Sequence, residues 1–135
     1  MKMKVEEILA RRKDPARMER MKPILDRIPP AWGKYLPEPG WDDLLLEVNE
    51  RLAVLDPGYE INQVKEKFGG LRYYITCSDD LYRLEGNDVR DAMYRIIGEA
   101  EDRSTTICEY CGQPGKARSL SWIKTLCDEH AGEEN

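Results

Sequence analysis

Three cysteines and the single histidine of the chain form two short pairs near the C-terminus. Two residues separate Cys108 from Cys111, a loop over 112–126 follows, and two residues separate Cys127 from His130. This spacing is typical of a structural zinc ribbon or knuckle, because each pair can bind one ion from a tight turn. Gly112, directly after Cys111, lets the first turn close. We therefore predict one structural Zn²⁺ held by these four side chains, in preference to four unrelated residues or a disulfide between the nearer cysteines.

Four protein ligands leave no open position on the ion for water or substrate, so we expect the ion to stabilise the fold without doing chemistry. The lone histidine is committed to the metal, and no glycine-rich loop has the spacing of a phosphate cradle. We therefore expect no catalytic residues and no small-molecule substrate. A metal-dependent hydrolase or nuclease, the third-ranked hypothesis, needs a second metal beside Asp42, Asp79 or Glu85.

The 135 residues fit one modest core, and no stretch approaches the roughly 18 apolar residues of a membrane span. The N-terminal residues lack the apolar run of a signal peptide, which predicts a reducing cytoplasm where thiolates hold metal. Cys77, the fourth cysteine, lies in an apolar run and is expected to be a buried core residue.

The net charge of −5 is unevenly distributed. Residues 1–34 carry ten Lys or Arg and five Asp or Glu, giving +5, whereas residues 35–135 carry eleven and twenty-one, giving −10. An acidic protein is a poor general binder of nucleic acid, since that affinity comes mainly from neutralising phosphates. The charge therefore weighs against nucleic acid without excluding it.

Hydrophobic periodicity predicts an α+β chain, with helices packed on a small antiparallel β-hairpin and a C-terminal zinc ribbon. We expect a basic helical arm with a Pro-rich linker over residues 1–40, a body over 41–104 and the ribbon over 105–135. The expected elements are one or two helices over 4–28 with Asp14 as a cap, a helix over 41–55, strands over 59–68 and 71–77 joined by Gly69-Gly70, and a helix over 87–103 capped by Asn87.

On the second strand, Leu71, Tyr73, Ile75 and Cys77 are expected to face one way, and Arg72, Tyr74 and Thr76 the other. In the linker, Trp32, Tyr35 and Leu36 are expected to pin the chain to the body. An exposed aromatic contact site is the alternative there.

Basic and aromatic residues mark a candidate binding surface on the hairpin and the ribbon. Their ordinary interpretation is a solvated strand face on the hairpin and, for Trp122, the small core of the ribbon. The alternative is a platform that stacks bases and neutralises phosphates. The residues concerned are Lys65, Lys67, Arg72, Tyr74, Lys116, Arg118, Trp122 and Lys124.

Three stretches carry a resemblance to a known family: residues 63–74 (QVKEKFGGLRYY), 107–115 (ICEYCGQPG) and 122–131 (WIKTLCDEHA). Together they resemble a family of uncharacterised small proteins of bacteriophages and prophages, over roughly residues 41–131. The resemblance implies a phage origin, action in the host cytoplasm and the same four metal ligands, and it supplies no activity.

Phage accessory proteins of this size often act by binding a host machine, including defence systems, which is an expectation by class. Our first hypothesis is therefore a zinc-stabilised, non-enzymatic module that binds, and in that role inhibits, a host protein. The second is a small nucleic-acid-binding regulator that uses the ribbon and the basic hairpin.

Overall fold

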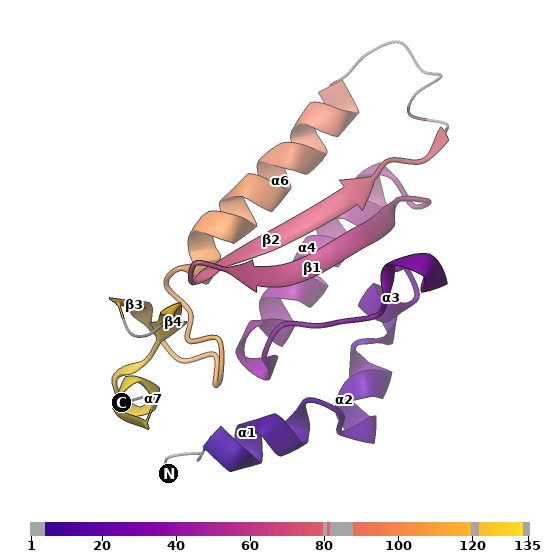
Figure 1. Ribbon diagram of the computed structural model, residues 1–135. Coiled ribbons are helices and arrows are strands. Elements are labelled where there is room, and N and C mark those ends of the chain that lie inside the picture. Colours follow the sequence, from indigo (N-terminus) through magenta and orange to yellow (C-terminus); the bar gives the residue numbers. More distant parts are fainter. Residues whose placement is uncertain (1–4, 80, 82–87, 120–121, 134–135) are drawn as a thin grey trace.

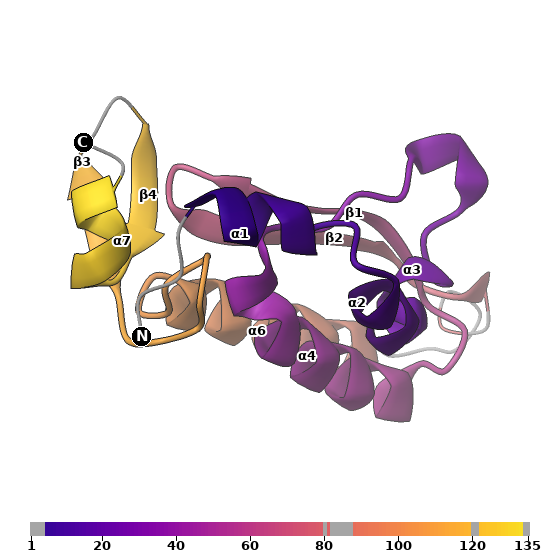
Figure 2. The same ribbon diagram turned by 90° about the horizontal axis from the view of Figure 1, so that it is seen from below.

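The body of the protein consists of a β-hairpin and two long helices, α4 (Asp42–Leu55) and α6 (Asp88–Ser104). A computed structural model describes residues 5–79, 81, 88–119 and 122–133. In it, α4 and α6 lie side by side on one face of the antiparallel pair β1 (Glu60–Lys67) and β2 (Gly70–Thr76) (Figures 1 and 2). A smaller antiparallel pair, β3 (Lys116–Ser119) and β4 (Ile123–Leu126), precedes the short helix α7 (Asp128–Glu133). The predicted α+β class is confirmed.

One continuous core joins these elements. The buried stripe of α4 includes Leu45, Val48 and Leu52, and that of α6 includes Met93, Ile96, Ile97 and Ala100. Both stripes recur at helical spacing, which is why the sequence predicted them. Asn87, the expected cap of α6, lies outside the described residues.

The hairpin alternates between a buried and an exposed face, as a half-buried strand should. On β2, Leu71, Tyr73 and Ile75 are buried, whereas Tyr74 and Thr76 are exposed and Arg72 is half-buried. The predicted facing of this strand is confirmed, and Cys77 just after it is also buried. Four of the predicted binding residues, Lys65, Lys67, Arg72 and Tyr74, therefore share the outer face.

The turn of the hairpin differs from the prediction by one residue. Lys67 pairs with Gly70, so the two turn residues are Phe68 and Gly69, with φ of 54° and 82°. Gly70 belongs to the strand because α6 holds its neighbour, the Leu71 N–H donating to the Ser104 hydroxyl over 2.8 Å. Residues with φ above zero at both positions make a type I′ turn, which glycine and asparagine favour and phenylalanine does not.

The N-terminal segment, expected as one or two helices, forms three short ones: α1 (Val5–Arg11), α2 (Pro15–Arg20) and α3 (Lys22–Leu25). Asp14 caps α2 as predicted, accepting from the Ala16 N–H over 3.1 Å. Pro23 explains the break before α3, since proline lacks the N–H that a continuous helix needs.

This segment is attached to the body by a buried ion pair. Arg17 donates to both carboxylate oxygens of Asp42, at 2.9 and 2.8 Å, and to the Pro37 carbonyl at 2.7 Å. The two side chains are 7% and 4% exposed. Asp42 thus has a structural partner at the start of α4.

The linker contains two 3₁₀ turns, η1 (Pro30–Trp32) and η2 (Pro39–Trp41). Trp32 and Tyr35 are 62% and 76% exposed, so the prediction that they pin the linker to the body is wrong, although Leu36 is half-buried. The anchor is Trp41, which is fully buried at the end of the linker. A local pattern of prolines and aromatics does not distinguish between these tryptophans, because burial depends on which residues from elsewhere in the chain pack against them.

Candidate metal centre

The four predicted ligands come together at the base of the small hairpin. Cys108 and Cys111 lie in the turn before β3, Cys127 directly follows β4, and His130 is in α7. Their ligand atoms all lie within 4.8 Å of one another. Among the residues that the structure describes, they are the only group of three or more His, Cys, Asp or Glu that could hold a metal ion.

The donor atoms have the spacing of a tetrahedral site. The Cys111 and Cys127 sulfurs are 3.8 Å apart, and His130 Nδ1 lies 3.6 Å from the Cys108 sulfur and 3.2 Å from the Cys127 sulfur. An ion with metal–sulfur bonds of about 2.3 Å and a metal–nitrogen bond of about 2.0–2.1 Å needs edges of about 3.8 Å and 3.5 Å, respectively. All four cysteines of the chain are free thiols. The cluster could therefore hold a metal ion and is compatible with a structural zinc.

The backbone closes the first ligand pair tightly. The Gly112 N–H donates to the Cys108 carbonyl over 2.9 Å, and Gly112 has φ of 81°, which glycine adopts without strain. The Cys108 N–H donates in turn to the Gln113 carbonyl over 2.8 Å. The second pair is held by the Ala131 N–H, which donates to the Cys127 carbonyl over 3.0 Å at the start of α7.

Ionisation of the thiols in the cluster requires a cation beside them. Burial raises the pKa of the Cys111 thiol to about 12, and the neighbouring Cys108 thiol adds to the rise. Several thiolates cannot accumulate in so small a volume unless a positive charge stabilises them. The Tyr110 ring packs edge-on against the His130 ring, with 5.6 Å between centroids, and helps to fix the imidazole.

The segment that carries the four candidate ligands, residues 107–119 and 122–133, is called the lobe below, and it is hydrogen-bonded to the body at several points. The Gly40 N–H donates to the Glu109 carbonyl over 2.8 Å, and the Trp41 indole donates to the Ile107 carbonyl over 2.9 Å. On the other side, the Thr125 hydroxyl donates to the Gly69 carbonyl over 2.5 Å, which ties β4 to the turn of the large hairpin. The linker and the hairpin turn thus both contact the lobe.

The predicted binding residues of the ribbon do not form one basic face. Arg118 is bound to Asp128 over 2.7 Å and to the Leu126 carbonyl over 3.2 Å. Lys124 donates to the Tyr110 hydroxyl over 2.6 Å. Both cations are therefore bound by other residues of the lobe, Arg118 by a carboxylate at its surface, and Lys116 remains exposed.

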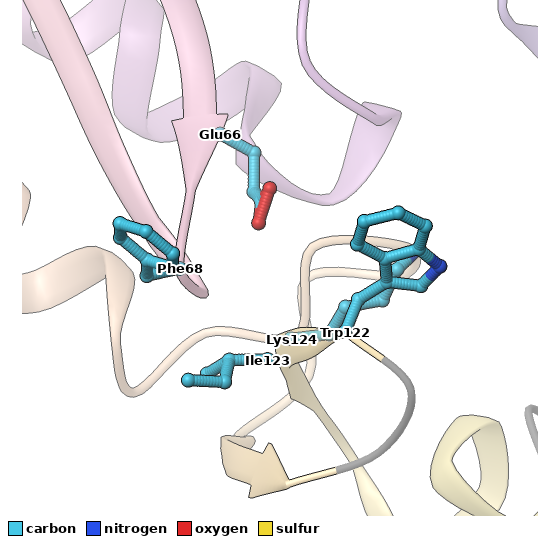
Figure 3. Close-up of a pocket in the computed structure, with 5 residues that line it drawn as sticks. All are labelled: Glu66, Phe68, Trp122, Ile123 and Lys124. Carbon is cyan, nitrogen blue, oxygen red and sulfur yellow. The ribbon is translucent and has the colours of Figure 1, made fainter.

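Trp122 does not pack in the core of the ribbon, although its ordinary interpretation predicted that it would. Its side chain is 74% exposed, so it does not fill the core of the ribbon, which Leu126 and Tyr110 form with the ligands. It lines a hollow of about 340 Å³ beside the turn of the large hairpin, with Glu66, Phe68, Ile123 and Lys124. Figure 3 shows the Glu66 carboxylate pointing into the space between the Phe68 and Trp122 rings.

The binding surface predicted from the sequence did not include three residues of this hollow, Glu66, Phe68 and Ile123. Phe68 and Trp122 are far apart along the chain, so only the fold brings them together. The usable signal was a phenylalanine directly before Gly69 in a tight turn, where a small residue is usual.

No family model, no curated protein and no solved structure matches the chain. The resemblance to phage proteins therefore stays a prediction. Of the described residues, none belongs to a helix whose length and apolar character would let it cross a membrane. The fold and the ligand cluster define an α+β protein with a Cys₃His cluster that could hold a metal ion.

Proposed function

We propose that the protein is a non-enzymatic interaction module, stabilised by one structural Zn²⁺, that binds another protein. Zinc is the ion that suits three thiolates and one imidazole at tetrahedral spacing. Four protein ligands would complete its coordination and leave no position for a substrate. The lobe would then serve as a rigid support for the surface beside it.

One observation carries the proposal: two large exposed aromatic side chains line one hollow from opposite sides, on hairpins that are bonded to each other. Phe68 and Trp122 are 69% and 74% exposed, and Ile123 beside them is 43% exposed. Aromatic residues dominate the energetics of protein interfaces, and an exposed cluster of them marks a contact site. The resemblance to phage proteins suggests a host protein as the partner.

Capture from host lysate with matched variants tests this function. The double variant Phe68→Asn/Trp122→Ala removes the exposed rings, whereas Val54→Ala truncates an apolar side chain of α4 that is 82% exposed. A protein retained in stoichiometric amount by the wild type and Val54→Ala, and lost with the double variant, supports the proposal. Retention of the same proteins by all three, or of none at any salt concentration, refutes it.

Metal analysis tests the zinc. We expect one zinc per chain in the wild type and in Cys77→Ser, because Cys77 lies in the core of the body. More than one metal per chain would instead favour the hydrolase hypothesis.

A second candidate function, binding of single-stranded nucleic acid, is favoured by the outer face of the large hairpin. Lys65 and Arg72 are paired across the strands, and Tyr74 lines a surface hollow with Trp32, Asn62 and Gln63. Stacking rings beside cations are what such ligands need. It ranks second because Arg118 and Lys124 are bound by other residues of the lobe and residues 35–135 carry −10.

Fluorescence anisotropy with a labelled dT oligonucleotide tests this candidate. Binding at low salt that weakens steeply with added salt, and that Lys65→Ala/Arg72→Ala reduces at least about tenfold, would support it. Absence of binding at low ionic strength would exclude it.

A further inference from the structure

We infer that the hollow between Phe68 and Trp122 is a receptor for one arginine side chain of the partner protein. This inference rests on the proposed function and names the side chain of the partner that the interface would bind. It follows from the charge, the aromatic walls and the backbone of the hollow.

The charge that faces the hollow is negative. The Glu66 carboxylate points between the two rings (Figure 3), and one of its oxygens accepts from the Gly69 N–H over 3.0 Å. The other charged lining residue, Lys124, places its ammonium 2.6 Å from the Tyr110 hydroxyl and 3.7 Å from a Glu109 carboxylate oxygen. Its charge is thus directed into the ribbon, so of the two charged lining residues Glu66 is the one that faces the hollow. Lys67, which is not a lining residue, holds its ammonium over the Phe68 ring.

The walls suit a flat cation with an apolar stem. A guanidinium stacks on aromatic faces and pairs with carboxylates, and its three methylene groups need apolar contact. Phe68, Trp122 and Ile123 supply those surfaces, and Glu66 supplies the counter-charge. Lys67 already lies over the Phe68 ring, with its ammonium 5.7 Å from the centroid, so this ring does contact a cation.

The backbone gives an independent reason to assign a role to Phe68. With φ of 54°, it occupies the left-handed region, which bulky side chains rarely adopt and which asparagine or glycine adopts readily. A ring that is 69% exposed gains little from packing in return. Strained residues of this kind cluster at binding sites. The backbone conformation at position 68 therefore disfavours phenylalanine, and the exposed ring contributes little to folding stability. A role in binding would explain why phenylalanine occupies this position.

NMR titration of the zinc-loaded full chain tests the inference, with N-acetyl-arginine amide as the probe and N-acetyl-citrulline amide as its uncharged isostere. We expect millimolar, saturable shifts at the Gly69 amide and the Trp122 indole with the arginine probe. Citrulline should bind at least about tenfold more weakly, since it lacks the charge that Glu66 would pair with.

Two variants separate binding from folding. Glu66→Gln keeps an acceptor for the Gly69 N–H and should weaken the arginine probe about tenfold with an unchanged Tm. Phe68→Asn should lose binding while the Tm rises, a combination that a purely structural role would not give. Lys67→Ala removes a like charge and should leave binding equal or stronger.

Equal affinity for arginine and citrulline, or full affinity in Glu66→Gln, overturns the inference. If lysate capture still depends on Phe68 and Trp122, the interaction function stands and only the arginine assignment falls. If the Gly69 amide and Trp122 indole resonances shift on addition of a dT oligonucleotide and not of the arginine probe, the hollow binds nucleic acid and the inference is also overturned.

Discussion

Replacing Gly40 by alanine should separate the linker from the metal-ligand lobe. A Cβ at this position would lie 2.1 Å from the Cys108 carbonyl oxygen and 2.6 Å from both the carbonyl carbon and oxygen of Glu109. All three are backbone atoms, so no side chain can turn away, and the chains must move apart by more than an ångström to reach contact of about 3.5 Å. The movement would break the Gly40 N–H bond to Glu109 and strain that of Trp41 to Ile107.

The expected loss follows from these contacts. Two hydrogen bonds contribute about 1 kcal/mol each, and overpacking costs about 1–3 kcal/mol, of which relaxation recovers part. We therefore expect Gly40→Ala to lower the free energy of unfolding by about 2–4 kcal/mol, or roughly 8–15 °C in Tm for a chain of this size. Zinc content should stay at one per chain, because no ligand changes.

Urea unfolding followed by circular dichroism at fixed free zinc measures this loss. Gly98→Ala is the matched control: it lies inside α6 with nothing within 4 Å of the added Cβ. Alanine there should raise stability by about 0.5–1 kcal/mol, since glycine is unfavourable in a helix. Substitutions at the surface usually change the free energy of unfolding by less than about 0.5 kcal/mol. If Gly40→Ala changes it by no more than that, the lobe is not docked through this contact.

Three further outcomes follow from other contacts. Cys127→Ser should abolish stoichiometric zinc binding and leave the segment that holds the ligands without fixed structure, because metal binding and folding are coupled there. Elemental analysis measures the zinc content, and amide hydrogen exchange measures the structure of the segment. Retained zinc together with native protection from exchange would contradict this prediction. Burial raises the pKa of Tyr59 from 10.0 to about 12, so the stability that its proton provides is complete below pH 10 and is lost as pH rises toward 12; denaturant unfolding across this window should show a falling free energy, and a flat profile would count against it. Asp42→Ala should cost about 3–5 kcal/mol by leaving the Arg17 guanidinium buried and unpaired, whereas Asp43→Ala, at an exposed carboxylate, should cost less than about 0.5 kcal/mol.

The sequence was informative where one physical constraint acts along a short stretch. Alternation along residues 71–77 gave the buried face of β2, and helical spacing gave the stripes of α4 and α6. The spacing of the Cys and His pairs gave the ligand cluster, since two tight turns can reach one ion.

The sequence was uninformative where distant residues compete for the same side chain. Arg118 and Lys124 were candidate phosphate contacts in the sequence, but Asp128 and Tyr110 bind them. The turn of the large hairpin moved by one residue because Ser104, at the far end of α6, fixes the start of β2. No local pattern encodes such partners. The phenylalanine before Gly69 marked an unusual turn, but only the fold shows which residues line the hollow with it.

If the cluster binds zinc as proposed, the two walls of that hollow should respond differently to its removal. Phe68 belongs to the large hairpin, whose buried residues form one cluster with the helices, whereas Ile123 and Trp122 belong to the lobe, whose separate small cluster consists mainly of the ligands and their neighbours. Removing zinc with a chelator should therefore unfold the lobe, and with it the Thr125 bond to Gly69, while the body keeps its own core. We expect the arginine probe to lose its binding, the amides of α6 to keep their dispersion, and added zinc to restore the wall formed by Ile123 and Trp122 together with probe binding. Undiminished binding of the probe to the chelated protein would mean that the large hairpin alone forms the receptor and that the lobe has another purpose.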